Sequence, residues 1–249
     1  MRLWLSGLLS LFVFSLHAIP QFQFNGLIDA GPTLYRIELV EDGSKTDVID
    51  MYGVRGDATL LPIKDSGFAI KPTASYGKGD GDFISYGVGI GYYIPFCNER
   101  CYFVPTAGLN WTDLRTTLDL SGDRINSALP ASLIFTDVRE KFDSQSRYIG
   151  FDLMCQVCEP VWATFIYQYA WAKTDTVLLN DQFTTIGFPD GRIDSKGQSQ
   201  GSNFGLAIDY YFCENVAATI AGGFNTSLDE NRFGIRAYGV KFGIGYYFK

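Results

Sequence analysis

The sequence predicts an all-β protein, a closed antiparallel transmembrane β-barrel of about ten strands. Three observations lead to this fold. Segments of about ten residues alternate between large apolar residues and small or polar ones, which is the period of a β-strand. Aromatic residues stand at the ends of these segments. Glycine supplies 27 of the 249 residues, well above its usual share of about 7%.

The first 18 residues predict a secretory signal peptide. Arg2 provides the positive start, an apolar stretch runs from Leu3 to Leu16, and the small residue Ala18 precedes the expected cleavage site. The apolar stretch is shorter than the roughly 20 residues that a membrane-spanning helix needs. Residues 19–249 contain no linker-like change of composition and are predicted to form a single barrel domain.

The alternation is clearest from Phe83 to Ile94, where large apolar side chains occupy one parity and glycine most of the other. The segment from Tyr238 to Phe248 repeats the pattern. A soluble sheet turns polar side chains toward water on its second face. Glycine suits a crowded interior instead, and a row of large apolar side chains suits lipid. Because every backbone polar group in lipid must be paired, such strands must close into a barrel.

Ten segments follow this pattern. In chain order they are Leu27–Ile37, Ile49–Leu60, Phe68–Tyr76, Phe83–Ile94, Tyr102–Leu114, Tyr148–Cys155, Trp162–Ala172, Asn203–Tyr211, Val216–Phe224 and Ile235–Phe248. Eight or twelve strands are also compatible with the sequence, because the first 60 residues are the least regular. An even number puts both termini on the periplasmic side, with short turns there, at 62–67, 98–100, 156–157 and 214–215. Long outer loops are predicted at about 115–147 and 174–201.

Aromatic spacing supports strands that cross a membrane. The segment from Phe103 to Trp111 is nine residues long, counted with both aromatics, and the segment from Trp162 to Trp171 is ten. A strand needs roughly 9 to 11 residues to cross a bilayer, and aromatic girdles mark both interfaces of such barrels. These segment lengths therefore fit a bilayer.

The C-terminal segment Phe242-Gly-Ile-Gly-Tyr-Tyr-Phe248, together with the alternation along the mature chain, resembles that of bacterial outer-membrane β-barrel proteins. The resemblance implies a place in the bacterial outer membrane and contact with its lipid. It also implies that the barrel-assembly machinery recognises Phe242, Ile244, Tyr246 and Phe248. Lys249 departs from the pattern, because most such proteins end on the aromatic residue itself.

The five cysteines follow or open predicted strands. Three residues separate Cys97 from Cys101, and two separate Cys155 from Cys158, which are hairpin-loop lengths. Each pair is therefore predicted to face across its ladder within reach of a disulfide. Cys213 is left over, which predicts an intermolecular thiol. These positions resemble the chlamydial type of outer membrane, whose proteins are cross-linked by disulfides, and the resemblance implies disulfide-linked outer-membrane partners.

Catalysis is not predicted. The only histidine, His17, lies in the segment expected to be removed, and no G-x-S-x-G signature is present. The carboxylate pairs Asp80 with Asp82 and Asp190 with Asp194 lie in turn-rich polar segments, where solvated loop charges are the simplest interpretation. No cofactor or metal site is predicted. The net charge of −7, with scattered Lys and Arg, argues against a nucleic-acid partner.

The interior of the predicted barrel contains a set of charged residues, which lie on the face opposite the lipid-facing side chains. They are Asp29, Arg55, Asp57, Lys71, Asp152, Asp209 and Lys241. Uncompensated charge in a narrow, partly desolvated space costs several kcal/mol, so opposite charges are predicted to pair. We expect a non-catalytic, porin-like narrow pore for small solutes. The alternative is a surface-exposed structural or adhesin protein whose barrel only anchors the long outer loops.

Overall fold

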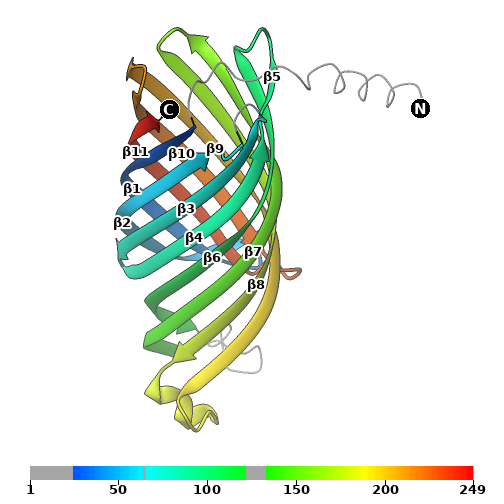
Figure 1. Cartoon of the computed structure of the whole chain (residues 1–249). Coiled ribbons are helices and arrows are strands. Elements are labelled where there is room, and N and C mark those ends of the chain that lie inside the picture. Colours follow the sequence, from blue (N-terminus) through cyan, green and yellow to red (C-terminus); the bar gives the residue numbers. More distant parts are fainter. Residues whose placement is uncertain (1–24, 64–65, 122–132, 249) are drawn as a thin grey trace, which may run out of the picture.

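The computed structural model describes residues 25–63, 66–121 and 133–248, and it confirms the predicted closed antiparallel barrel (Figure 1). Strands that follow each other in the chain pair with each other, except β4 (Gly81–Tyr92) and β5 (Ile94–Phe96). The first strand, β1 (Gly26–Glu41), pairs with the last, β11 (Gly234–Phe248), and β4 pairs with β6 (Cys101–Ser121), so the barrel is closed. Ten strands of the described chain form this barrel, and the short β5 pairs with β6 outside it. The predicted signal peptide, residues 1–18, lies outside the described residues.

The described elements have the following bounds. They are β1 (Gly26–Glu41), β2 (Ser44–Leu60), β3 (Phe68–Gly79), β4 (Gly81–Tyr92), β5 (Ile94–Phe96), β6 (Cys101–Ser121), β7 (Ile134–Cys158), β8 (Val161–Leu179), the 3-10 helix η1 (Asp181–Ile186), β9 (Arg192–Cys213), β10 (Val216–Leu228) and β11 (Gly234–Phe248). In the described part of the chain, no helix is long and apolar enough to span a membrane.

The outer surface of the barrel carries an apolar belt. Large apolar residues of one strand parity are exposed on β1, β2, β4 and β6 to β11, among them Leu34, which is 60% exposed, and Ile244, which is 65% exposed. The opposite parity holds glycine, threonine and charged residues that are half-buried or buried. A contiguous exposed apolar surface of this kind has lipid as its solvent.

Glycine on the inner face makes room for large side chains. A Cβ atom at Gly89 or Gly108 would collide with the hydroxyl oxygen of Tyr148, which projects from β7 toward β4 and β6. Gly243 is similar, because a Cβ there would lie 2.8 Å from a carboxylate oxygen of Asp29. The glycine-rich parity of the sequence therefore reflects a crowded interior.

The strands run further than the sequence predicts at the end of the barrel where η1 lies, called here the extended end. There β6 reaches Ser121, β7 begins at Ile134 and the hairpin of β8 and β9 closes only at residues 180–191. Figure 1 shows these strands passing beyond the shorter β3 and β4. The predicted loops 115–147 and 174–201 are therefore too long. Beyond the belt the outer face of each strand no longer faces lipid. The apolar residues therefore move from the outer face to the inner face, while the backbone pairing of the strands continues.

The opposite end, called here the short-turn end, holds both described termini and the short connections. One connection differs from its prediction. Residues 156–157 belong to β7, which continues to Cys158, and the turn lies at Glu159 and Pro160. A ladder irregularity between Gln156 and Cys158 accompanies this shift.

Candidate functional site: the barrel interior

The centre of the interior holds a cluster of ion pairs between β1, β2 and β11. The ammonium group of Lys241 contacts the carboxylate of Asp29 and donates to Asp57 Oδ2 at 2.7 Å. Arg55 Nη2 donates to Asp57 Oδ1 at 2.8 Å. Asp29 and Lys241 are buried. Buried charges of this kind are tolerated only when they are paired, because desolvation penalises each charge severely.

A second ion pair inside the barrel joins β3 to β7. Lys71 of β3 reaches the carboxylate of Asp152 on β7, 81 residues further along the chain. The two strands are separated in the barrel by β4 and β6, so this pair bridges the interior over those strands. Asp152 is buried and Lys71 is half-buried.

The remaining predicted member, Asp209, does not join these ion pairs. Its carboxylate accepts a hydrogen bond of 2.6 Å from the hydroxyl of Thr219. Thr219 of β10 is directly opposite Asp209 of β9, and its partner on β11 is Gly243. Asp209 thus lies beside the ion-paired residues, and its hydrogen bond comes from a hydroxyl and not from a basic side chain.

Aromatic residues pack together inside the barrel at the short-turn end. Tyr102, Val104 and Trp162 form a buried cluster there. The rings of Tyr102 and Trp162 stack with centroids 6.0 Å apart, and Tyr93 meets Tyr102 edge-on at 6.2 Å. Tyr93, Met154 and Tyr211 pack against this cluster. These residues, called here the aromatic layer, lie nearer the short-turn end than the ion-paired residues Asp29, Arg55, Asp57, Lys71, Asp152 and Lys241, called here the charged layer.

A larger apolar cluster lies inside the barrel at the extended end, and we call it the extended-end cluster. Its buried members are Ile37, Leu39, Ile49, Met51, Leu114, Leu118, Leu120, Phe135, Val138 and Phe183. Residues of β4, β8, β9 and β11 pack against them, so the cluster receives side chains from most of the circumference. Its members lie on the same strand faces as the charged layer, further toward the extended end.

The connection from β8 to β9 contributes Phe183 to this cluster. Asn180 caps η1 by accepting a hydrogen bond from the backbone N–H of Gln182, and the amide group of Asn180 donates to the carbonyl of Thr136. These contacts hold η1 over the β7 side of the opening. Phe183 is fully buried and its ring meets that of Phe135 at 5.2 Å.

The sequence analysis missed the extended-end cluster, although a signal for it exists. In β1 the outward residue Leu34 is apolar, but the next outward residue, Arg36, is charged, while the inward neighbour Ile37 is apolar. The pairing of β1 with β2 runs without a register shift through these positions. The apolar side of the strand therefore changes from outside to inside at the edge of the belt.

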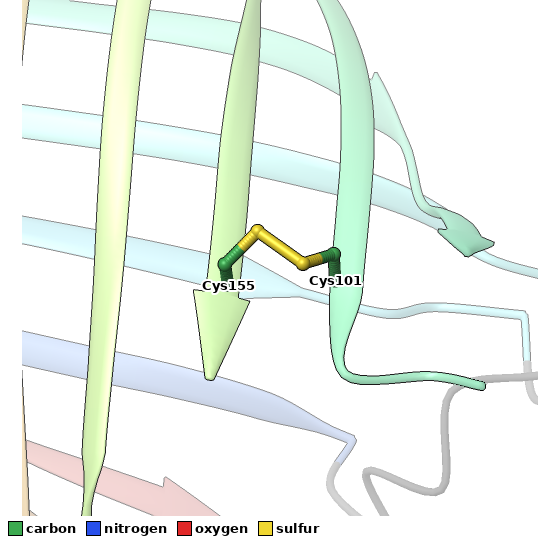
Figure 2. The surroundings of a disulfide bond; sticks show 2 residues. All are labelled: Cys101 and Cys155. Carbon is green, nitrogen blue, oxygen red and sulfur yellow. A yellow bond between two sulfur atoms is a disulfide. The ribbon is translucent and has the colours of Figure 1, made fainter. Parts of the chain in front are cut away.

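The disulfide differs from both predicted pairs. Cys101 and Cys155 are directly opposite each other on β6 and β7 and are bonded, with Cα atoms 4.2 Å apart (Figure 2). Cys97 lies in the turn before β6, and Cys158 shares β7 with Cys155. The predicted hairpin disulfides Cys97–Cys101 and Cys155–Cys158 are therefore wrong. Across the β5–β6 ladder Cys101 is opposite Phe96 and not Cys97, and the predicted turn after Cys155 begins too early. Cys97, Cys158 and Cys213 are free and exposed, so Cys213 is not the only candidate for an intermolecular link.

The predicted C-terminal signal lies on the outward face of β11. Phe242, Ile244 and Tyr246 are exposed as part of the apolar belt, and Phe248 pairs in register with Gly26 of β1. These residues thus occupy the strand that closes the barrel against β1.

Charged residues cover the outward face at the extended end. Arg192 forms a bidentate pair with Asp194, and Lys141 lies 2.9 Å from Asp143. Hydrogen bonds from the Arg192 guanidinium hold the pKa of the Asp194 carboxyl below its usual range. Because these pairs are exposed, each contributes little to stability, and this outward surface faces water.

Comparison with known proteins supports the fold. No protein-family model matches the chain, and no curated protein matches it by sequence. Among solved structures, it is similar to the outer membrane protease OmpT from Escherichia coli, with a TM-score of 0.60 and 12% identity over 92% of this chain and 98% of that one. A weaker likeness, with a TM-score of 0.41 and 11% identity, relates 90% of the chain to 97% of the attachment invasion locus protein Ail of Yersinia pestis. The likeness to OmpT shows the fold of the chain, a closed antiparallel β-barrel, and the exposed apolar belt is the kind of surface that such a barrel turns toward lipid.

Proposed function

We propose that the protein is a non-catalytic outer-membrane barrel with a sealed interior, which anchors strand hairpins that project beyond the membrane. The observation that carries this proposal is the extended-end cluster. Water and ions cross a barrel along a continuous polar lining, and a densely packed apolar layer interrupts such a lining. The aromatic layer at the short-turn end adds a second interruption.

The projecting surface supports the second half of the proposal. The hairpins of β6 with β7 and of β8 with β9 are the longest of the barrel, and their outward faces carry exposed charged pairs. Neither the charged layer nor the belt requires such long hairpins. A surface raised above the membrane on rigid strands is suited to contact molecules outside the cell.

Solute entry into liposomes tests the sealed interior. Liposomes that contain the refolded protein should swell in solutions of a small sugar no faster than protein-free liposomes. A porin of known permeability, reconstituted at the same density, provides the positive control. Swelling as fast as in that control would contradict the proposal.

A narrow pore for small solutes is the second candidate, and the polar character of the central layer favours it. Beside the ion pairs, Asn203 donates to Gln168 at 3.0 Å, and Thr112 donates to Ser85 at 3.1 Å. If this path conducts, replacing Arg55 or Lys241 by alanine should raise sugar uptake. Unchanged uptake in both variants, with the fold intact, favours the anchor.

Covalent linkage to neighbouring proteins is part of the same proposal. Cys97, Cys158 and Cys213 are exposed on connections or strand ends of the short-turn end. On non-reducing gels of outer membranes we expect oligomers that disappear with reductant. Cys213→Ser alone should weaken the ladder, and serine at all three positions should abolish it. A ladder that persists in the triple variant would contradict this linkage.

The same proposal includes recognition of β11 by the barrel-assembly machinery. Phe242, Ile244 and Tyr246 present apolar side chains outward along β11. Replacing Phe242 and Tyr246 by serine should reduce the amount of folded barrel in cells, whereas Tyr52→Ser, which changes the same belt on β2, should have a smaller effect. Equal losses in the two variants would contradict a specific role for β11.

A further inference from the structure

A groove crosses the outward face of β6 to β10, and the functions proposed above do not use it. It encloses about 410 Å³, and its lining includes Leu109, Trp111, Arg147, Trp171 and Lys173. The groove continues over Gln198 and Gln200 to residues 228–230 at the end of β10.

Strand register explains why these residues lie together. Leu109 is paired with Arg147, Arg147 with Trp171, Trp171 with Gln200 and Gln200 with Leu228. One straight row of outward side chains thus crosses five strands. The neighbouring row toward the extended end contains Trp111, Gln145, Lys173 and Gln198 in the same way.

These two rows lie at the edge of the apolar belt. On β7 the outward residue before Arg147 toward the short-turn end is Ile149, which is exposed and apolar, and on β9 the apolar run ends at Phe204. Charged residues such as Asp113 and Asp175 begin immediately beyond. Tryptophan at this height is typical of the interface between acyl chains and headgroups. The groove is therefore at the level of lipid headgroups.

The charges of the groove are balanced but not paired with each other. Arg147 and Lys173 are exposed, and no ion pair within residues 25–63, 66–121 and 133–248 includes either of them. At the β10 end, Asp229 Oδ1 accepts hydrogen bonds from the backbone N–H groups of Asn231 and Phe233, and Glu230 is exposed. Two basic groups thus occupy the middle of the groove and two carboxylates its end.

We propose that this groove binds the headgroup of a phospholipid that carries both a phosphate and an amine. The phosphate lies against Arg147 and Lys173, because guanidinium and ammonium groups are the usual phosphate partners of proteins. The amine lies toward Asp229 and Glu230. The acyl chains run along the apolar belt from Leu109 and Trp171 toward the short-turn end. A zwitterionic headgroup offers an opposite charge to both the basic pair and the acidic pair, whereas a purely anionic headgroup offers one to the basic pair alone.

Lipid binding to the folded protein in detergent micelles tests this proposal. Native mass spectrometry compares phosphatidylethanolamine, phosphatidylglycerol, which lacks the amine, and diacylglycerol, which lacks both groups. We expect phosphatidylethanolamine to bind about tenfold more tightly than phosphatidylglycerol, and diacylglycerol not to bind. Equal binding of the two phospholipids would overturn the proposal.

Variants locate the binding site. The double variant Arg147→Gln with Lys173→Gln should weaken phosphatidylethanolamine binding about tenfold or more. Glu230→Gln should reduce the preference for the amine. The control, Lys141→Gln with Lys196→Gln, removes the same charge from the outward faces of β7 and β9 beyond the groove, and should bind as the native protein does. Native binding by the groove variant, or an equal loss in the control, would overturn the proposal, and the gel shift between unheated and boiled samples verifies that each variant is folded.

Discussion

In the membrane part of the barrel, apolar side chains point outward, and charged residues or glycine occupy the inner face. Beyond the membrane, the same strands carry apolar side chains on the inner face and charged side chains on the outer face. On β6 the outward residues change from Leu109 and Trp111 to Asp113 and Arg115, while Leu114 and Leu118 are buried inside. The backbone ladder is the same in both parts. The solvent outside the strand therefore decides which side is apolar.

The two parts also differ in how they hold charge. Lys241, Asp29 and Asp57 interact in the interior, where desolvation makes each partner necessary to the others. Arg192 and Asp194 form an equally short contact on the outward surface, where water and salt replace most of the attraction. Ion pairs of similar geometry therefore differ in their contribution to stability, and the predictions below test this difference.

The largest effect is expected for Lys241→Met, which leaves the carboxylates of Asp29 and Asp57 without their shared cation. Removing one partner of a buried ion pair costs about 3–5 kcal/mol. Urea unfolding of the protein in lipid vesicles measures this loss. Lys196→Met, at an exposed position whose ion pair with Asp175 is 3.7 Å long, is the control and should unfold close to the native midpoint. Equal midpoints for both variants would contradict the buried network.

The second largest effect is expected for Phe183→Ala at the extended end. Truncating a fully buried phenylalanine costs about 3 kcal/mol or more, and here the loss should be local. Hydrogen exchange should accelerate at Ile37, Leu39 and Val138, which belong to the same cluster, and remain slow in the ladder around Lys241. Phe233→Ala, at an exposed side chain, should change neither. Uniform acceleration over the whole barrel would refute a separate extended-end cluster.

A smaller effect is expected for Gly243→Ala. The added Cβ would lie 2.8 Å from Asp29 Oδ1, so Asp29 must shift away from Lys241 at a cost of roughly 1–3 kcal/mol. Gly222→Ala is the matched control, because the nearest atom to its added Cβ is 4.0 Å away. Urea midpoints of the two variants measure the difference. A greater loss at Gly222 than at Gly243 would argue against crowding around Asp29.

The smallest effect is expected for Arg192→Gln on the outward surface. Hydrogen bonds from Arg192 lower the pKa of Asp194, so the interaction is fully present above the unfolded-state pKa of the carboxyl and is lost as the pH falls through the lowered folded-state pKa. Exposure and salt screening make this contribution small. At neutral pH and physiological salt, the urea midpoint should not change measurably. A shift as large as that of Lys241→Met would remove the distinction between the two regions.

The strands of the membrane part could be predicted because lipid imposes a simple rule, namely one apolar face per strand. The partners inside the barrel could not. Lys71 and Asp152 are brought together by the closure of β4 on β6, and no local pattern encodes that contact. The pair Cys155–Cys158 was mispredicted because the turn after β7 lies at Glu159 and Pro160, and a small shift of a turn changes which cysteines are opposite each other.

Single-channel conductance of the refolded protein in a planar lipid bilayer tests the sealed interior most directly. The extended-end cluster and the aromatic layer lie on either side of the charged layer, so the native protein should show no steady conductance. Steady channels in the native protein, with a current that Phe183→Ala leaves unchanged, would contradict the closed interior.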